Sequence, residues 1–423
     1  MKVAVIGAGS TYTPELAQGF LAHADTFPLD ELALMDIDVR RLEIVGSFAE
    51  RLLARGGSGR TRVIKTTDRR EAVSGADFVI AQIRVGGQKA RHEDTILALG
   101  YGTIGQETTG VGGFAKAMRT IPAMLDIAKD IAEVAPGAWL INFTNPSGLV
   151  TEAVSRHSPV KTIGLCNGPY GTVTAIAAGL GVPREKVWVD YVGLNHLSWI
   201  RRVMVDGRDV TDEVVKEIVS RYKAANVPEA DFSPEFIEAL GMIPSSYLRY
   251  YYLRDEMAPH LAAQPKTRAE VVMQVEEKLL ELYADPSRDT VPEELSKRGG
   301  AYYSTVAVAL MDAIVNDRRD VHIINIPNGG TVPDLSPEAV VETPAVVGRA
   351  GAYPVVTGGR LEPSIRWLIQ AVKAYEELTI RAAVERSRRH AILALAAHPL
   401  VGSVNKAVSL VGDLDSRYGW DLR

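Results

Sequence analysis

The chain has 423 residues, of which 46% are hydrophobic and 23% are charged, so it can bury a large core and should form two domains or one two-lobed unit. Its formal net charge of −5 gives no reason to expect nucleic acid or an anionic membrane as a partner. No apolar run is long enough to span a bilayer, and no signal-peptide pattern precedes the first expected strand, so we expect a cytoplasmic protein.

The first segment, residues 1–10, predicts a strand that runs into a glycine-rich turn. Gly7, Gly9 and Ser10 form the pattern Gly-x-Gly-Ser, and a run compatible with a helix begins near residue 15. In a dinucleotide-binding fold such glycines let the backbone approach a pyrophosphate, whose charge the next helix N-terminus stabilises. A third glycine would fall at Tyr12, so we expect the helix to contact the strand in a different way here.

A second expected strand, residues 31–36, ends in Asp36, at about the spacing of a carboxylate that binds the ribose hydroxyls of adenosine. An acid at this place would repel a 2′-phosphate, which favours NAD over NADP. The alternative is a strand, turn and helix with incidental glycines.

Further strands are expected at residues 61–66 and 77–83, with a helix at 68–74 between them. This alternation predicts a doubly wound parallel sheet of the α/β class, with its ligand at the carboxyl ends of the strands. Arg84 follows the fourth strand, where we expect a loop to meet the cofactor. The loop at 101–113 carries Glu107 and is rich in glycine, hydroxyl and amide groups, which is typical of a binding loop. A helix at 114–132 and a strand at 138–143 lead to Asn145.

Cys166 is the only cysteine, so it cannot form an internal disulfide. It follows one apolar run, and His196 follows another at residues 187–192. A thiolate and an imidazole at two strand ends suit manganese, iron, cobalt or zinc, provided that the two ends are neighbours in space. Two alternatives stay open: Cys166 as a packed core thiol, and His196 as a hydrogen-bonded structural residue.

Six motifs in one order give the chain a resemblance to glycoside hydrolase family 4, and within it to the 6-phospho-β-glucosidases, along nearly the whole length. They are Gly-x-Gly-Ser-Thr-Tyr-Thr-Pro, Ile-Gly-Gln-Glu-Thr, Asn-Phe-Thr-Asn-Pro, Cys-Asn-Gly-Pro, Gly-Leu-Asn-His and Tyr-Leu-Arg-Tyr-Tyr-Tyr. The resemblance implies a reaction in which NAD takes hydride from C3 of the sugar and a tyrosine removes the acidified proton on C2. The aglycone is then eliminated from C1, water adds, and the hydride returns. A divalent metal, Mn²⁺ above all, would polarise the oxygens at C2 and C3.

The same resemblance implies residue roles. Cys166 and His196 would bind the metal, Tyr247 would be the catalytic base, and Glu107 would raise the basicity of that tyrosine. A base with an unperturbed pKa of about 10 needs a nearby cation near neutrality. The residues that match substrate-binding positions are Arg91, Asn145, Asn167 and Arg268.

Asn167 is informative, because the α-glucosidase branch has an aspartate there that acts as general acid. An amide cannot protonate a leaving group, so we expect Asn167 to bind substrate or water, and the proton donor to the aglycone is unassigned. Each residue also has an ordinary alternative: Tyr247 as core or interface, and Arg91 and Arg268 as solvated surface residues.

We expect an NAD-binding Rossmann-like domain at residues 1–160 and a larger mixed α+β domain at 161–423 for metal binding, catalysis and oligomerisation. An amphipathic run at 362–397 predicts one long or two consecutive helices, packed on the sheet or on another subunit of a homodimer or homotetramer. The partner would be a small phosphorylated sugar. Two other functions stay open: an NAD-dependent hydroxy-acid dehydrogenase and a non-catalytic NAD-binding sensor. Within the family, a glycosidase for non-phosphorylated or α-linked glycosides is also possible.

Overall fold

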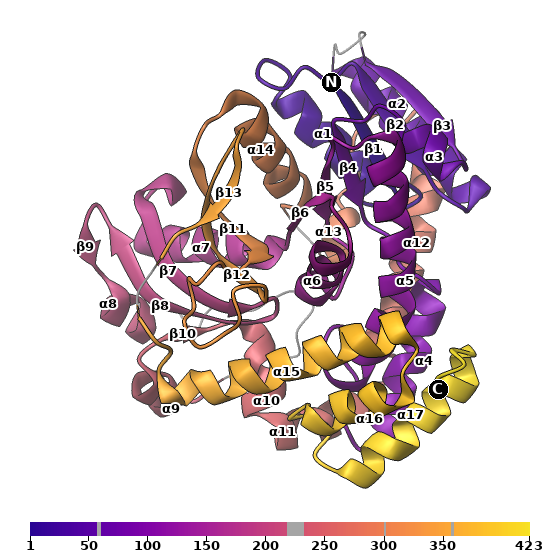
Figure 1. The fold of residues 1–423 in the computed structure, drawn as a ribbon. Helices are drawn as coiled ribbons and strands as arrows, with labels where there is room; N and C mark the ends of the chain where they lie inside the picture. Colours follow the sequence, from indigo (N-terminus) through magenta and orange to yellow (C-terminus); the bar gives the residue numbers. More distant parts are fainter. Residues whose placement is uncertain (57–60, 218–231, 300–301, 357–358) are drawn as a thin grey trace.

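The computed structural model describes residues 1–56, 61–217, 232–299, 302–356 and 359–423. Six parallel strands lie side by side in the order β6-β5-β4-β1-β2-β3, in the upper right part of Figure 1. This is the strand order of a dinucleotide-binding fold, and it reverses between β1 and β4. The predicted α/β class and its doubly wound parallel sheet are confirmed. The strands are β1 (Lys2–Ile6), β2 (Glu31–Met35), β3 (Arg62–Thr66), β4 (Phe78–Ala81), β5 (Trp139–Asn142) and β6 (Lys161–Gly164).

Alternate side chains of these strands point to opposite faces, and both faces are covered by helices. On one face Val3, Leu34 and Ile80 pack with α1, α2 and α14. On the other face Ala33 and Val79 pack with α3, α5 and α6. These helices are α1 (Thr13–Ala22), α2 (Val39–Arg55), α3 (Arg69–Val73), α5 (Gly110–Val134), α6 (Ser147–His157) and α14 (Tyr303–Asn316).

Three strands from the C-terminal half extend the same sheet beyond β6. Each of them is antiparallel to the strand next to it, and β11 is antiparallel to β6, where Asn325 pairs with Gly164. The domain boundary near residue 160 stays a prediction, although β5 and β6, which flank it, are neighbours in one sheet. The added strands are β11 (Asp320–Pro327), β12 (Val340–Gly348) and β13 (Gly351–Pro354).

A second, smaller sheet lies beside α7 (Asn167–Leu180), at the left of Figure 1 and away from the six parallel strands. Its main unit is a hairpin in which β7 (Val187–Leu194) pairs with β8 (Leu197–Val205), and only Asn195 and His196 form the turn. Two short strands, β9 (Arg208–Asp209) and β10 (Ile243–Pro244), both pair with β8. The hairpin therefore presents His196 at its tip.

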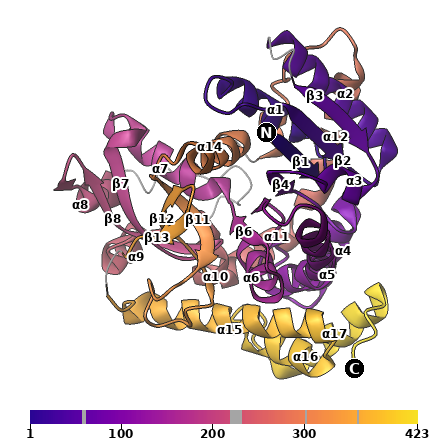
Figure 2. The same ribbon diagram turned by 45° about the horizontal axis from the view of Figure 1, so that its top comes forward.

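The predicted amphipathic run forms two consecutive helices, α15 (Pro363–Glu385) and α16 (Arg388–Ala397), followed by α17 (Val404–Tyr418). Figure 2 shows α15 lying along both halves of the molecule, and its apolar face packs on α5.

No helix in the described residues is long and apolar enough to cross a membrane. The other helices are α4 (Gly87–Gly100), η1 (Arg184–Lys186), α8 (Thr211–Glu217), α9 (Pro234–Leu240), η3 (Ser246–Leu248), α10 (Arg249–Tyr252), α11 (Arg254–Ala262), α12 (Arg268–Ala284) and α13 (Leu295–Arg298).

A buried ionic cluster joins α15, α6 and the start of β12. The Lys373 ammonium lies 2.6 Å from a Glu152 carboxylate oxygen and 2.5 Å from one of Glu376, and all three residues are buried. Lys373 also donates to the Val340 carbonyl at 2.9 Å, and the Val340 amide donates to Glu152 at 2.8 Å. The cluster thus fixes the first residue of β12, a strand that lines the site described below.

The Lys373→Ala variant should lower the free energy of unfolding by ~3–5 kcal/mol, because Glu376 would be left buried without its cation and Glu152 would keep only Arg156. Lys278→Ala is the control, since Lys278 pairs with Glu281 at the surface of α12, and an exposed pair contributes only ~0–1 kcal/mol. Urea unfolding of both variants measures the difference. Equal losses would contradict the role given to the cluster.

Candidate active site at the carboxyl ends of the parallel strands

A cavity of about 1100 Å³ opens where β1, β2, β4, β5 and β6 end. Such an edge is where open α/β sheets bind their ligands. The cavity brings together every residue for which the sequence predicts a role. These are Gly7, Gly9, Ser10, Asp36, Arg84, Arg91, Glu107, Asn145, Cys166, Asn167, His196, Tyr247 and Arg268.

The glycine-rich turn after β1 is held against the end of β2. Gly7 has φ +91°, a conformation that favours glycine, and its amide donates to the Met35 carbonyl at 2.9 Å. The Gly9 amide donates to Asp36 Oδ2 at 2.7 Å, and a Cβ on Gly9 would lie only 2.8 Å from that oxygen. Glycine is therefore needed for the Asp36 carboxylate to lie directly on the turn.

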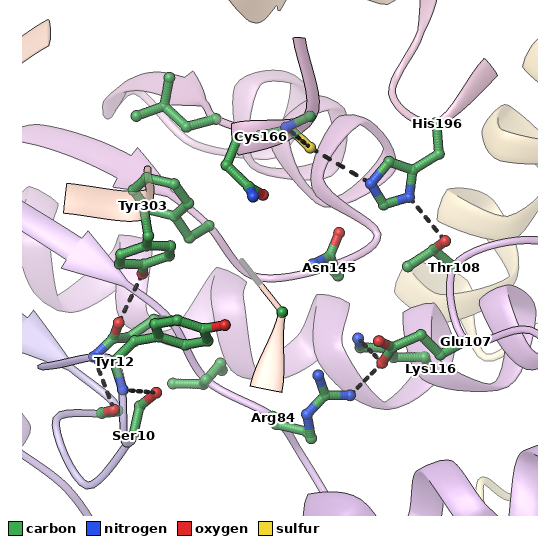
Figure 3. A pocket seen from close by; sticks show the side chains of 18 of the residues that line it. Ser10, Tyr12, Arg84, Glu107, Thr108, Lys116, Asn145, Cys166, His196 and Tyr303 are labelled. Atoms are coloured by element: carbon green, nitrogen blue, oxygen red, sulfur yellow. Dashed lines mark hydrogen bonds and ion pairs between the residues drawn. The ribbon is translucent and has the colours of Figure 1, made fainter. Parts of the chain in front are cut away.

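Tyr12 occupies the position of the third glycine and is the residue directly before α1. Its ring stacks on Tyr303 with centroids 5.5 Å apart (Figure 3). The centroid of the Tyr303 ring in turn lies 3.9 Å from that of Phe143. The Thr13 hydroxyl donates to the Ala8 carbonyl at 2.8 Å. An aromatic stack with α14 thus replaces the close helix-to-strand contact that a glycine would give.

Cys166 and His196 come from different sheets and meet in the cavity. Cys166 caps the N-terminus of α7, where its sulfur accepts from the Gly168 amide at 3.3 Å. His196 has φ 66°, which is strained for a residue with a side chain. Its Nε2 lies 3.5 Å from Cys166 Sγ, and its Nδ1 lies 2.8 Å from the Thr108 hydroxyl (Figure 3). The His196 and Tyr247 rings stack at 3.9 Å, only 5° from parallel.

The chemistry of this pair fits one transition-metal ion. A separation of 3.5 Å suits two ligand atoms that each lie ~2.0–2.3 Å from the same ion. Burial lowers the pKa of His196 to about 4, so the imidazole is neutral near pH 7. Burial, and next the Glu342 carboxylate, raise the pKa of Cys166 to about 12, so a nearby cation is needed to make the thiolate. The described residues contain no cluster of three His, Cys, Asp or Glu, so further ligands would be small molecules or other side chains.

Glu107 is the centre of a cationic cluster that lines another part of the cavity wall, and the next residue, Thr108, contacts His196. Its carboxylate pairs with Arg84 and, at 2.8 Å, with Lys116 (Figure 3). It also pairs with Arg91 at 3.2 Å. Burial alone would raise the pKa of Glu107, but the three cations hold it well below its usual range. Burial lowers the pKa of Lys116 to about 7. The wall carries more positive than negative charge, which favours an anionic ligand.

The loop that carries Glu107 and Thr108 lies directly on the first turn of α5. A Cβ on Gly112 would lie 2.3 Å from the Gln106 carbonyl oxygen, and one on Gly113 would lie 2.7 Å from the Thr108 carbonyl carbon. The glycines at the start of α5 therefore have a packing reason, because the loop could not otherwise approach the helix.

The predicted substrate-binding residues line the same cavity as the Cys166–His196 pair and the Glu107 cluster. Asn145 follows β5 and lies between the Cys166 and Glu107 groups in Figure 3, whereas Asn167 is the first residue of α7. Arg268 is the first residue of α12, and its guanidinium donates to the Arg298 carbonyl at 2.9 Å.

Sequence reasoning missed three cavity residues. Lys116 is a cation between apolar residues, Phe114-Ala115 and Ala117-Met118, a signal that could have revealed it. Arg298 follows a charged stretch and gave no signal; it pairs with Glu276 at 2.7 Å and lies over the Tyr12 ring. Glu342 is 1% exposed on β12, and burial raises its pKa to about 7.

Comparisons with known proteins cover nearly the whole chain. Residues 2–182 match the family 4 glycosyl hydrolases, and residues 191–401 match the C-terminal domain of that family. The chain is 42% identical to a probable 6-phospho-β-glucosidase of Bacillus subtilis, covering 98% of this chain and 95% of the relative. It is 31% identical to a phospho-α-glucosidase of Clostridium acetobutylicum, covering 98% and 96%.

Solved structures agree with these relatives. The 6-phospho-β-glucosidase of Thermotoga maritima, solved with manganese, NAD⁺ and glucose-6-phosphate, superposes with a TM-score of 0.91 at 36% identity over all of both chains. A malate dehydrogenase of Plasmodium falciparum has a TM-score of 0.56 at 14% identity, covering 91% of this chain and 99% of that one, which is a likeness of fold alone. The resemblance predicted from six motifs is therefore confirmed: the chain belongs to family 4 of the glycosyl hydrolases and is a glycosidase.

Proposed function

We propose that this glycosidase hydrolyses 6-phospho-β-glucosides and requires NAD and a divalent ion, for which Mn²⁺ is the best candidate. The observation that carries the proposal is one cavity lined by the dinucleotide turn, the Cys166–His196 pair and Tyr247. The relatives named above, with their phosphorylated substrates and their bound NAD and manganese, support it.

Gly7, Gly9 and Ser10 would hold the dinucleotide phosphates, Asp36 the adenosine ribose, and Cys166 and His196 the ion. NAD would supply a hydride acceptor for C3 of the sugar, and the ion a positive charge beside the oxygens at C2 and C3. Arg84, beyond β4, would keep Glu107 at the cofactor's end of the cavity through their ion pair.

Tyr247 would remove the proton from C2. Its ring stacks on the His196 imidazole with centroids 3.9 Å apart, which supports a place beside the proposed ion. Arg91 interacts electrostatically with Tyr247 and is also paired to Glu107. Glu107 would therefore act on the tyrosine by setting the position of this cation. Once C2 is deprotonated, the aglycone leaves from C1, and water adds in its place.

The cationic wall supports a phosphorylated substrate. Arg91 and Arg268 would bind the phosphate, because a guanidinium can donate two hydrogen bonds to one anion. Asn145 would bind sugar hydroxyls. Asn167 cannot protonate a leaving group, and the chain is more similar to a β-glucosidase relative, at 42%, than to an α-glucosidase relative, at 31%. Both observations favour the β-linked substrate.

We also propose that the protein forms a homodimer or homotetramer through its C-terminal domain. Trp367 of α15 and Leu393 of α16 support this, since both expose about half of their large apolar side chains, 53% and 43%.

Hydrolysis of 4-nitrophenyl 6-phospho-β-glucoside by cofactor-stripped protein should require both NAD and Mn²⁺, because each supplies chemistry that the side chains lack. Release of nitrophenol is measured with each component omitted in turn. No net NADH should form, since the hydride returns, whereas a hydroxy-acid dehydrogenase would accumulate NADH. Full hydrolysis without either component would refute the proposal.

The Tyr247→Phe variant should lower kcat by ~10²–10⁴-fold, the usual contribution of a general base. It should also abolish exchange of a C2 deuterium with solvent, which mass spectrometry of recovered substrate measures. Tyr250→Phe is the matched control, because Tyr250 lies in the same segment but does not line the cavity. Continued exchange in Tyr247→Phe would remove Tyr247 from the role of base.

The Arg268→Ala variant should raise KM for the 6-phosphorylated glucoside ~10-fold or more, as expected for loss of a hydrogen bond to a charged group. Lys278→Ala, on the exposed side of the same helix, should leave KM unchanged. Steady-state kinetics with phosphorylated and unphosphorylated glucosides provide the measurement. Equal activity on both substrates would show that the phosphate is not recognised.

A further inference from the structure

Glu342 is a buried carboxylate for which the proposed reaction has no use. It lies on β12 with 1% of its surface exposed, and it lines the cavity. No ion pair to Glu342 is found in the described part of the chain, and its hydrogen-bond donors are neutral: Tyr191 at 2.8 Å, Asn195 at 2.9 Å and Asn325 at 3.3 Å. A carboxylate buried without a cation is expensive, so a structural role that an apolar residue could fill is a poor explanation.

The residues that hydrogen-bond Glu342 connect it to both proposed metal ligands. Asn195 is the other turn residue of the β7–β8 hairpin and directly precedes His196. Its side-chain amide donates to Glu342 Oε1 and also hydrogen-bonds the Cys166 sulfur. One amide, oriented by one carboxylate, therefore connects the tip that carries the imidazole to the thiol.

A second connection runs through the large sheet. Asn325 is the cross-strand neighbour of Glu342, and it donates both to Glu342 and to the Gly164 carbonyl, at 3.5 Å, two residues before Cys166. Glu342 thus contacts the hairpin that ends in His196 and the strand pair that leads to Cys166.

The close packing around Asn195 leaves little room for another arrangement of the side chains in this network. A Cβ on Gly148, in α6, would lie 3.2 Å from the Asn195 Cβ and 3.4 Å from Asn325 Oδ1. Tyr191, which holds the other Glu342 oxygen, is itself within hydrogen-bond distance of Ser198, at 2.5 Å. The carboxylate is therefore fixed on both oxygens.

We propose that Glu342 is a positioning residue that, through Asn195 and Asn325, fixes the separation of Cys166 and His196 so that both bind one divalent ion. The inference rests on the proposed function, since it assumes that this pair binds the ion. Groups that orient metal ligands in this way typically change metal affinity 10–100-fold when they are replaced.

Glu342→Gln tests this, because glutamine keeps the volume but loses one of the two acceptor oxygens. Isothermal titration with Mn²⁺ should give a Kd ~10–100-fold higher than that of the wild type. Titration with NAD should give an unchanged Kd, since the dinucleotide turn is not part of the network. An unchanged Kd for Mn²⁺, or equal losses for both ligands, would overturn the inference.

A double-mutant cycle with Asn195→Ala separates positioning from a general structural effect. Because Glu342 acts through Asn195 as well as Asn325, Glu342→Gln should raise the Kd for Mn²⁺ by a smaller factor in the Asn195→Ala background than in the wild type, and fully additive losses would overturn the inference. If Glu342→Gln does not fold, Asn195→Ala alone should weaken Mn²⁺ but not NAD, and unchanged Mn²⁺ affinity there would also overturn it.

The controls distinguish the two proposals. Wild-type protein that neither binds Mn²⁺ nor hydrolyses the phosphorylated glucoside overturns both. Wild-type protein that does both, together with a Glu342→Gln variant of wild-type Mn²⁺ affinity, overturns the positioning role alone. As a spectroscopic measure, Co²⁺-loaded wild type should show thiolate-to-cobalt absorption, and Glu342→Gln should need ~10–100-fold more Co²⁺ to reach it.

Discussion

The site depends on the contact between the tip of a β-hairpin and the end of a parallel strand. His196 reaches Cys166 only because the β7–β8 turn has two residues and because His196 adopts a left-handed backbone conformation. That conformation is unfavourable for histidine and persists only where the surroundings hold it. Here they include the Thr108 hydroxyl and the Tyr247 ring, which both contact the imidazole. Three parts of the chain, far apart in sequence, must therefore fold together before the pair exists.

Electrostatics divide the cavity into two regions. Around Glu107 the charge is positive, with two arginines and Lys116 about one carboxylate. Around Cys166 the buried groups are neutral or acidic, and Glu342 raises the pKa of the thiol further. A phosphorylated sugar suits the first region, and a divalent cation suits the second. The two proposed ligands carry opposite charges and would each be attracted to a different one of these regions.

The sheet explains how a dinucleotide fold can serve a glycosidase. β1 and β2 end at the glycine turn and Asp36, whereas β5 and β6 end at Asn145 and Cys166. Because parallel strands share one carboxyl edge, the proposed cofactor and substrate sites are adjacent across the β1–β4 reversal. Strands β11 and β12 then extend the sheet past β6 and bring Glu342 to the same cavity.

The sequence alone determined features that depend on near neighbours in the chain. The Gly7–Gly9 turn, Asp36 at a strand end and the alternation of strands and helices each follow from local spacing, and the α/β class and the family are recognisable from such spacings and from the order of the motifs. All residues assigned by motif line one cavity. These signals survive without tertiary information because backbone conformation and strand periodicity are set within a few residues.

Only the tertiary structure decided which distant groups meet. Nothing near Glu342 in the sequence indicates that it contacts Asn195, 147 residues away, and the Tyr12–Tyr303 stack is equally non-local. The antiparallel extension of the sheet was also unpredicted, because strand order depends on pairing between segments whose sequences carry no mark of their partners. Local sequence specifies the elements and their ends, whereas burial and hydrogen-bond pairing across the whole fold decide which ends share a site.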